Sequence, residues 1–283
     1  MQYPWWTSYS KRELLAFAKE YPYVSKGQSY VFVRGQSYDL IDWADDPLRD
    51  GCVCNPAGEI VPVARHLESL EIHDVVPLSG RIPVLAYGSN AAPVQLARKF
   101  DPKGTSAIPV IKADVVGFDA VYSAHITRYG AVPATLAKSP GATLHTFITW
   151  LSEDELSVMH ESELGRSIAV IGNYVYGELA CAAVTSKGFS EGHLLHAYIS
   201  RFGALGQSAQ AIALVDLNAT GRVFTSATNI DVLTRVRDCL SPQDELDEFI
   251  LDAVRKDDVR MSWSSRLRES ALTHILPDFT DSF

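Results

Sequence analysis

An apolar run that ends in a short polar loop, Ile82-Pro-Val-Leu-Ala-Tyr-Gly-Ser-Asn90, decides the fold prediction. Its apolar residues predict a strand, and Gly88 marks the point where that strand ends. Pro93 is typical of the first turn of a helix, and apolar residues follow it at helical spacing. We therefore expect a strand, a tight loop and a helix, with the loop at the carboxyl end of the strand.

The loop between these two elements carries groups that bind anions. Backbone N–H groups at the start of a helix have no intrahelical acceptor, and the helix dipole is positive there. They can hold a carboxylate or a developing oxyanion, and Gly88 lets a ligand approach the backbone closely. We predict Tyr87, Gly88, Ser89 and Asn90 as substrate-binding residues. The alternative is an ordinary strand-to-helix turn in which Ser89 or Asn90 caps the helix.

Several β-prone runs follow this loop and its helix. They predict strands at residues 107–111, 115–122, 134–137, 144–150, 174–184 and 211–215. Ser139-Pro140-Gly141 separates the third run from the fourth, and this tripeptide is typical of a hairpin turn. Strands mixed with helices in this way predict the α+β class.

A second candidate site residue lies at the end of a predicted helix. Ser152-Glu-Asp-Glu155 is a capping box that opens this helix. Leu156, Met159, His160 and Glu163 then share one helical face. Because the two apolar residues face the core, Glu163 is carried toward it, where desolvation favours the protonated carboxyl and suits it to general acid–base chemistry. The alternative is a frayed helix end with the carboxylate in water.

Three segments, in this order along the chain, resemble the γ-glutamylcyclotransferase-like superfamily. Val84-Leu-Ala-Tyr-Gly-Ser-Asn90 is similar to its signature strand and loop, and Pro133-Ala-Thr-Leu-Ala-Lys-Ser-Pro-Gly141 resembles its hairpin motif. Leu151-Ser-Glu-Asp-Glu-Leu-Ser-Val-Met-His-Glu-Ser-Glu163 is similar to the segment whose final Glu is the catalytic acid–base. The likeness covers residues 82–184, about a third of the chain.

The resemblance implies a mixed β-barrel with flanking helices and a cavity at one end. There the loop at residues 87–90 would hold a glutamyl group, and Glu163 would take a proton from the substrate α-amine. The amine would then attack the γ-carbonyl, which gives 5-oxoproline and releases an amine or amino acid. Closure of a five-membered ring mainly needs alignment, so neither a metal nor a cofactor is expected.

Two further features concern the rest of this cavity. Alternation along its predicted strand points the Tyr122 hydroxyl into the cavity, so we predict Tyr122 as a substrate-binding residue, with a core aromatic as the alternative. His160 and Leu164 stand where the family has Asp and Gly, and residues 168–171 are aliphatic where the family often has an aromatic residue. We therefore expect the pocket beyond the glutamyl end to be built differently.

Extensions flank the region of likeness on both sides. Residues 1–80 predict an N-terminal α/β extension, with a capping box at Ser10-Lys-Arg-Glu13 and a strand at residues 30–33. Residues 81–226 form the predicted barrel domain. Residues 227–283 predict a helical C-terminal extension, whose expected role is packing or the formation of a homodimer.

Composition limits the expected partners and location. The chain has 283 residues, 47% of them hydrophobic, and a formal net charge of −9, which excludes a disordered chain and disfavours nucleic acid as a partner. No apolar run is long enough to cross a bilayer, and the first residues predict no secretory signal. Cys52-x-Cys54 lacks a second pair, and His193-x-x-His196, in a helix-like run, lacks a third ligand. We expect a cytoplasmic protein with reduced thiols and a small-molecule substrate.

Three functions remain open at this point. The first is a γ-glutamylcyclotransferase-like enzyme that releases 5-oxoproline from a γ-glutamyl amine or peptide. The second is a non-catalytic module on the same fold that binds or senses a small carboxylate. The third is an amide hydrolase in which Glu163 activates water.

Overall fold

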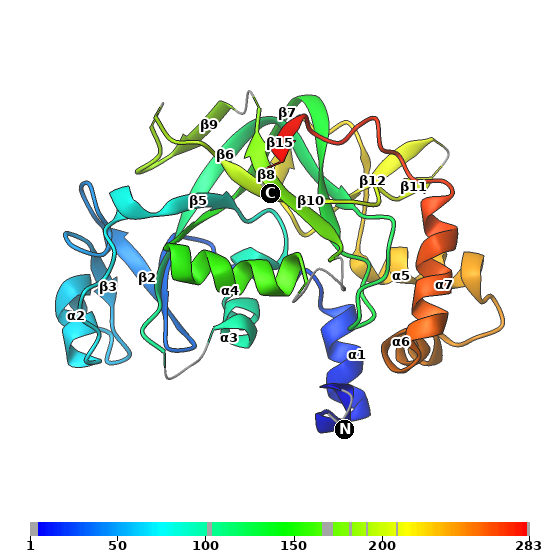
Figure 1. Ribbon diagram of the computed structural model, residues 1–283, viewed down its shortest axis with the longest axis horizontal. Coiled ribbons are helices and arrows are strands. Elements are labelled where there is room, and N and C mark those ends of the chain that lie inside the picture. The colour runs from blue at the N-terminus through cyan, green and yellow to red at the C-terminus, as the bar shows by residue number, and fades with distance from the viewer. Residues whose placement is uncertain are drawn as a thin grey trace.

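Two long antiparallel strands, β6 (Ala107–Tyr122) and β7 (Ala134–Leu151), form the centre of the computed structural model (Figure 1). The structure describes residues 5–100, 104–165, 172–180, 183–190, 192–207 and 209–281. Both strands are buried along most of their length, as expected for strands composed mainly of β-branched, aromatic and other apolar residues. Helices and one large mixed sheet place the chain in the α+β class, which confirms that part of the prediction.

In the described ranges this sheet has 15 strands. The shorter ones are β1 (Tyr30–Val33), β2 (Gln36–Asp42), β3 (Cys52–Cys54), β4 (Ile60–Pro62), β5 (Ile82–Leu85), β8 (Tyr174–Leu179), β9 (Ala183–Ser186), β10 (His196–Ser200), β11 (Gly206–Gln207), β12 (Gln210–Leu214), β13 (Ala219–Thr220), β14 (Thr225–Ala227) and β15 (Phe279–Asp281). The main path of pairing is β15-β8-β10-β5-β7-β6-β1-β2-β3-β4. β9 and β12 join it at β6 and β13 joins it at β7, while β11 and β14 pair with β12.

The outer edge of β6 is divided among three strands, and this keeps the sheet open. β1 pairs with residues 107–110 of β6, β9 with residues 113–116 and β12 with Val121. With that edge occupied, β6 cannot also pair with the far end of the sheet. Among the described residues no pairing joins β15 to β4, so the sheet is not closed into the barrel that the resemblance implied.

The Ser-Pro-Gly segment is a bulge in β7 and not the predicted hairpin turn. Residues 139–142 oppose Gly117 alone, and on both sides of them β7 pairs with β6. Pro140 has no N–H to donate to the ladder, and Gly141 has a φ of +86°, a value that favours glycine. The extra residues therefore leave the ladder without ending the strand.

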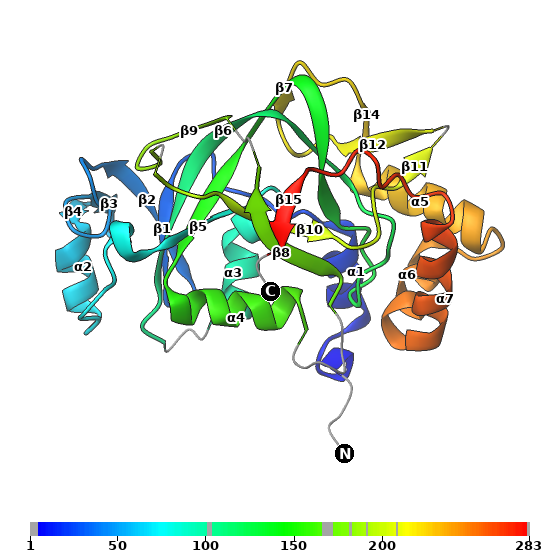
Figure 2. The same cartoon turned by 45° about the horizontal axis from the view of Figure 1, so that its top comes forward.

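Seven helices surround the sheet in the part of the chain that the structure describes. They are α1 (Lys11–Lys19), α2 (Val63–Ser69), α3 (Pro93–Lys99), α4 (Glu153–Glu163), α5 (Asn229–Leu240), α6 (Leu246–Arg255) and α7 (Asp257–Arg268). Figures 1 and 2 show α2 at one end of the molecule, α5, α6 and α7 at the other, and α4 below the sheet between them. Capping boxes open α1 and α4 at Ser10 and Ser152, as predicted. No helix in these ranges has both the length and the apolar character that a membrane span needs.

A buried ion pair fixes the start of α4. Arg81 Nη1 lies 2.6 Å from Glu155 Oε2, and the two side chains are only 2% and 6% exposed. The same Arg81 nitrogen donates to the Trp150 carbonyl at 2.9 Å. Because α4 is held at its amino end against β7, its carboxyl end at Glu163 has a defined position relative to the sheet.

The N-terminal helix is fastened to the C-terminal helices. Asn229, at the start of α5, is almost fully buried and donates to the carbonyls of Ala18 at 2.6 Å and Lys19 at 3.1 Å. Lys11 forms an ion pair with Glu248 of α6 at 2.8 Å. The segment that follows α1 therefore has a fixed path beside the centre of the sheet.

Candidate functional site

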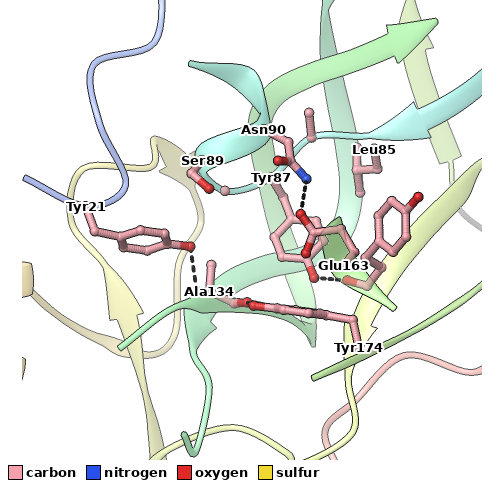
Figure 3. A pocket seen from close by; sticks show the side chains of 11 residues that line it. Tyr21, Leu85, Tyr87, Ser89, Asn90, Ala134, Glu163 and Tyr174 are labelled. Atoms are coloured by element: carbon pink, nitrogen blue, oxygen red, sulfur yellow. Dashed lines mark hydrogen bonds between the residues drawn. The ribbon is translucent and has the colours of Figure 1, made fainter. Parts of the chain in front are cut away.

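The loop after β5 opens into a small cavity (Figure 3). Gly88 precedes a 3₁₀ turn at Ser89–Ala91, and α3 begins only at Pro93. The predicted direct passage from strand to α-helix is therefore interrupted by this turn. The structure gives the backbone N–H groups of Gly88, Ser89 and Asn90 no acceptor among the described residues. All three residues line the cavity.

Glu163, the last residue of α4, meets this loop. Its side chain is 16% exposed and turns inward, in the direction that the helical spacing predicted. Asn90 Nδ2 donates to Glu163 Oε1 at 3.1 Å, and both side chains line the cavity (Figure 3). The structure thus brings together two of the sequence-predicted groups, the loop and the acid–base candidate.

Lys99, which the sequence analysis missed, lies beside both of these side chains. Its ammonium donates to Asn90 Oδ1 at 2.8 Å and forms an ion pair with Glu163 Oε1, and its side chain is only 6% exposed. The isolated carboxyl expected from desolvation alone is therefore a carboxylate with a buried counter-ion. The spacing held a signal, because Lys99 lies three residues after the fully buried Leu96 and so on the same helical face.

Four tyrosines form the walls of the cavity. Ala134 N–H donates to Tyr21 Oη at 2.7 Å, and Tyr174 Oη donates to the Ala134 carbonyl at 2.9 Å. Tyr87 Oη donates to the carbonyl of Tyr198. Two tyrosine hydroxyls therefore bracket the backbone of Ala134, and a third ties the loop to β10. Of the four, the sequence analysis predicted only Tyr87 as a site residue. The segments that carry Tyr21, Tyr174 and Tyr198 were assigned no role in the site.

Burial keeps these phenols neutral. It raises the pKa of Tyr21 and Tyr174 well above the ordinary value, and the negative charge of Glu163 raises both further. The pKa of Tyr87 and Tyr198 is raised for the same two reasons. Around Glu163 the tyrosines therefore act as neutral hydrogen-bonding groups and not as acids or bases near neutral pH.

His160 supports one wall from behind. Its Nδ1 lies 2.8 Å from Tyr198 Oη. Its ring packs edge-on against Tyr176, with the ring centroids 4.6 Å apart. Burial lowers the pKa of His160, and the nearby His196 lowers it further, so the ring is neutral at pH 7. His160 therefore lies behind Tyr198 and does not line the cavity itself.

The cavity is small. Its volume is about 40 Å³, room for a few water molecules. Its lining consists of Tyr21, Leu85, Ala86, Tyr87, Gly88, Ser89, Asn90, Ala134, Glu163, Tyr174 and Tyr198. This volume is too small to enclose a nucleotide or an oligosaccharide.

Tyr122 does not lie in this cavity, so the predicted substrate-binding role is not supported. Its side chain is fully buried in the main core, and its hydroxyl donates to the Ala227 carbonyl at 3.2 Å. Alternation along β6 points the ring inward as expected, but the interior at that position is packed core. The alternative interpretation, a core aromatic, describes Tyr122 as the structure places it.

The two sequence pairs considered as metal ligands lie in other settings. Cys52 and Cys54 are free thiols in β3. His196 is in β10 and His193 is in the preceding loop, so the helix-like run is not a helix. In the described ranges no three His, Cys, Asp or Glu side chains form a group that could hold a metal ion.

Tyr21→Phe is expected to lower the free energy of unfolding by about 1 kcal/mol. The change leaves the buried Ala134 N–H without its acceptor, which costs about 1–3 kcal/mol, and water entering the cavity reduces this loss. Urea denaturation measures it. Tyr38→Phe is the matched control, because no hydrogen bond of the Tyr38 hydroxyl is found among the described residues. Equal losses in the two variants would contradict the role given to Tyr21.

Comparison with known proteins adds no identification. No protein-family model, no curated protein and no solved structure matches this chain.

Proposed function

We propose that this protein is a γ-glutamylcyclotransferase-like enzyme that converts a γ-glutamyl amine or peptide to 5-oxoproline. One observation carries the proposal: all three segments that resemble the family contribute to one cavity. The first supplies the loop at residues 87–90, the second supplies Ala134 and the third supplies Glu163. Segments brought together only by a chance likeness would have no reason to converge there.

The arrangement suits intramolecular attack of the substrate amine. The Glu163 carboxylate takes one proton from the neutral α-amine of the glutamyl group as the amine nitrogen bonds to the γ-carbonyl carbon. The carbonyl oxygen becomes an oxyanion, for which the N–H groups of Gly88, Ser89 and Asn90 are the available donors. When the oxyanion collapses, the bond to the leaving amine breaks and Glu163 returns the proton to that amine.

Each part of this scheme calls for a group that the cavity contains. Ring closure has a high effective molarity once the chain is held in a bent form, so the tyrosine walls contribute mainly by alignment. Acid–base transfer contributes about 10²–10⁴-fold in typical enzymes. None of these steps needs a redox group. Under this proposal the cavity is built on an open sheet, whereas the resemblance implied a closed barrel.

Mass spectrometry for 5-oxoproline tests the proposal. Purified protein is incubated with γ-glutamyl amino acids, γ-glutamyl amines and glutathione, and we expect product from at least one member of this panel. Parallel reactions in ¹⁸O-labelled water separate the hydrolase alternative, because hydrolysis places solvent oxygen in free glutamate whereas cyclisation does not. Labelled glutamate without any 5-oxoproline would contradict the cyclotransferase proposal and support the hydrolase alternative.

Two observations favour a second candidate, a module that binds a small carboxylate without turnover. Glu163 is already paired with Lys99, and the cavity volume is only about 40 Å³. Calorimetric titration with glutamate, 5-oxoproline and other small carboxylates tests it. Saturable binding with no product from the panel would support this candidate, and multiple turnover would exclude it.

A further inference from the structure

Lys99 holds both polar side chains of the cavity without lining it. Its ammonium reaches Asn90 Oδ1, Glu163 Oε1 and, at 3.2 Å, the sulfur of Met159. It is absent from the cavity lining, so it lies behind Asn90 and Glu163 as seen from the ligand side. A substrate would therefore meet the two side chains that Lys99 holds and not Lys99 itself.

This contact fixes the orientation of Asn90. The two ends of a side-chain amide are hard to tell apart from shape alone, and the hydrogen-bond partners decide between them. An ammonium only donates, so it must face Oδ1, and Nδ2 is then left to donate to Glu163 at 3.1 Å. The three residues form a closed set in which Lys99 is the common donor.

The same contact leaves one Glu163 oxygen for the reaction. Oε1 accepts from Lys99 and from Asn90, whereas Oε2 has no hydrogen bond from the described residues. Glu163 is also the last residue of α4, where the helix dipole disfavours an anion. A buried carboxylate in that position needs a counter-charge to stay ionised, and Lys99 is placed to supply it.

We propose that Lys99 is a positioning residue that keeps Glu163 ionised and turns its Oε2 toward the substrate amine. The reaction part of this inference rests on the proposed function. Among the described residues, the titratable groups besides Lys99 that interact with the charge of Glu163 are phenols from other elements, which stay neutral: Tyr21, Tyr87, Tyr129, Tyr174 and Tyr198. Of these groups, Lys99 is the one that forms an ion pair with the carboxylate.

The pH profile of 5-oxoproline formation tests this role. In Lys99→Met we expect the acid limb of kcat to move upward by about one pH unit or more, since an opposite charge at this range shifts a titration by about 1–3 units. The loss of kcat should approach about tenfold for a one-unit shift at pH values below the acid limb, and it should shrink as the pH rises. Lys99→Arg, which keeps the charge, should retain the acid limb of the wild type. Lys112→Met, on the exposed face of β6, is the matched control.

The outcomes separate the inference from the proposed function. An active wild type whose Lys99→Met variant loses activity equally at every pH, or not at all, would overturn the role of Lys99 and leave the cyclotransferase in place. If the wild type forms no product, the interaction between Lys99 and Glu163 can be measured from stability instead. The thermal midpoints of Lys99→Met, Glu163→Gln and the double variant are then compared. A double variant more stable than Lys99→Met supports a stabilising interaction between Lys99 and Glu163, because removing both partners leaves no unpaired buried charge. Additive losses would overturn it.

Discussion

Glu163→Gln is expected to lower the rate of 5-oxoproline formation by about 10²–10⁴-fold, the usual contribution of a general acid–base. Glutamine keeps the length of the side chain and can still accept from Asn90 at the position of Oε1. It cannot take a proton from the substrate amine near neutral pH. The loss should therefore fall on kcat, with a smaller change in KM. Single-substrate kinetics on the preferred member of the panel measure both.

A matched substitution on the same helix controls for the chemistry of the change. Glu153→Gln makes the same replacement at an exposed position in the first turn of α4, away from the cavity, and should leave kcat unchanged. The thermal midpoint of Glu163→Gln checks its folding, since Lys99 loses its counter-ion in that variant. Turnover within a few-fold of the wild type in folded Glu163→Gln would remove Glu163 from the mechanism.

His125 carries the second large expected effect, a loss of stability in mild acid. The side chain is 1% exposed, its Nδ1 lies 2.8 Å from Ser123 Oγ, and its Nε2 has no partner among the described residues. Burial, with a smaller contribution from the charge of Arg268, lowers the pKa of His125 to about 3. The folded protein therefore holds this ring neutral at a pH at which an unfolded histidine, with an ordinary pKa of about 6.5, is charged.

The direction of the effect follows from proton binding. Below about pH 6.5 the unfolded state binds a proton that the folded state rejects, so stability from this group is present above pH 6.5 and is lost as the pH falls toward 3. Between pH 7 and pH 5 the loss is about 2 kcal/mol. Urea denaturation at the two pH values should show that His125→Asn, which cannot titrate there, loses about 2 kcal/mol less than the wild type.

The acidic residues titrate in both proteins. Their contribution therefore cancels when the loss of stability of His125→Asn between pH 7 and pH 5 is subtracted from that of the wild type. His73, an exposed histidine, supplies the matched control as His73→Asn, which should follow the wild type. If His125→Asn and the wild type lose the same stability between pH 7 and pH 5, the ring accepts a proton in the folded protein and the buried, neutral state assigned to it is wrong.

Local patterns predicted the elements that carry the cavity. The strand ending before Gly88, the capping box at Ser152 and the inward turn of Glu163 all depend on spacing within a few residues, and the structure has each of them. The Ser-Pro-Gly segment shows the limit of such reasoning. Hairpin turns and bulges use the same residues, and only the identity of the opposite strand, here β6 on both sides, distinguishes them.

The parts of the site that the sequence did not reveal depend on distant contacts. Tyr21 reaches the cavity from the N-terminal extension, and its role is set by Ala134, which is far along the chain. The open sheet likewise depends on which strands occupy the outer edge of β6. Lys99 is the exception, because its place on the face of Leu96 was visible in the helical spacing.

The docking of α1 against the C-terminal helices sets the time at which the cavity can form during synthesis. Tyr21 leaves the ribosome early, but the helix before it rests on α5 and α6, which are made much later. Because the strands at the centre of the sheet, β5, β6 and β7, precede α5 and α6 in the chain, they leave the ribosome before the helices that support Tyr21. In a nascent chain the Tyr21 wall of the cavity therefore gains the support of α5 and α6 only after translation has passed Arg255.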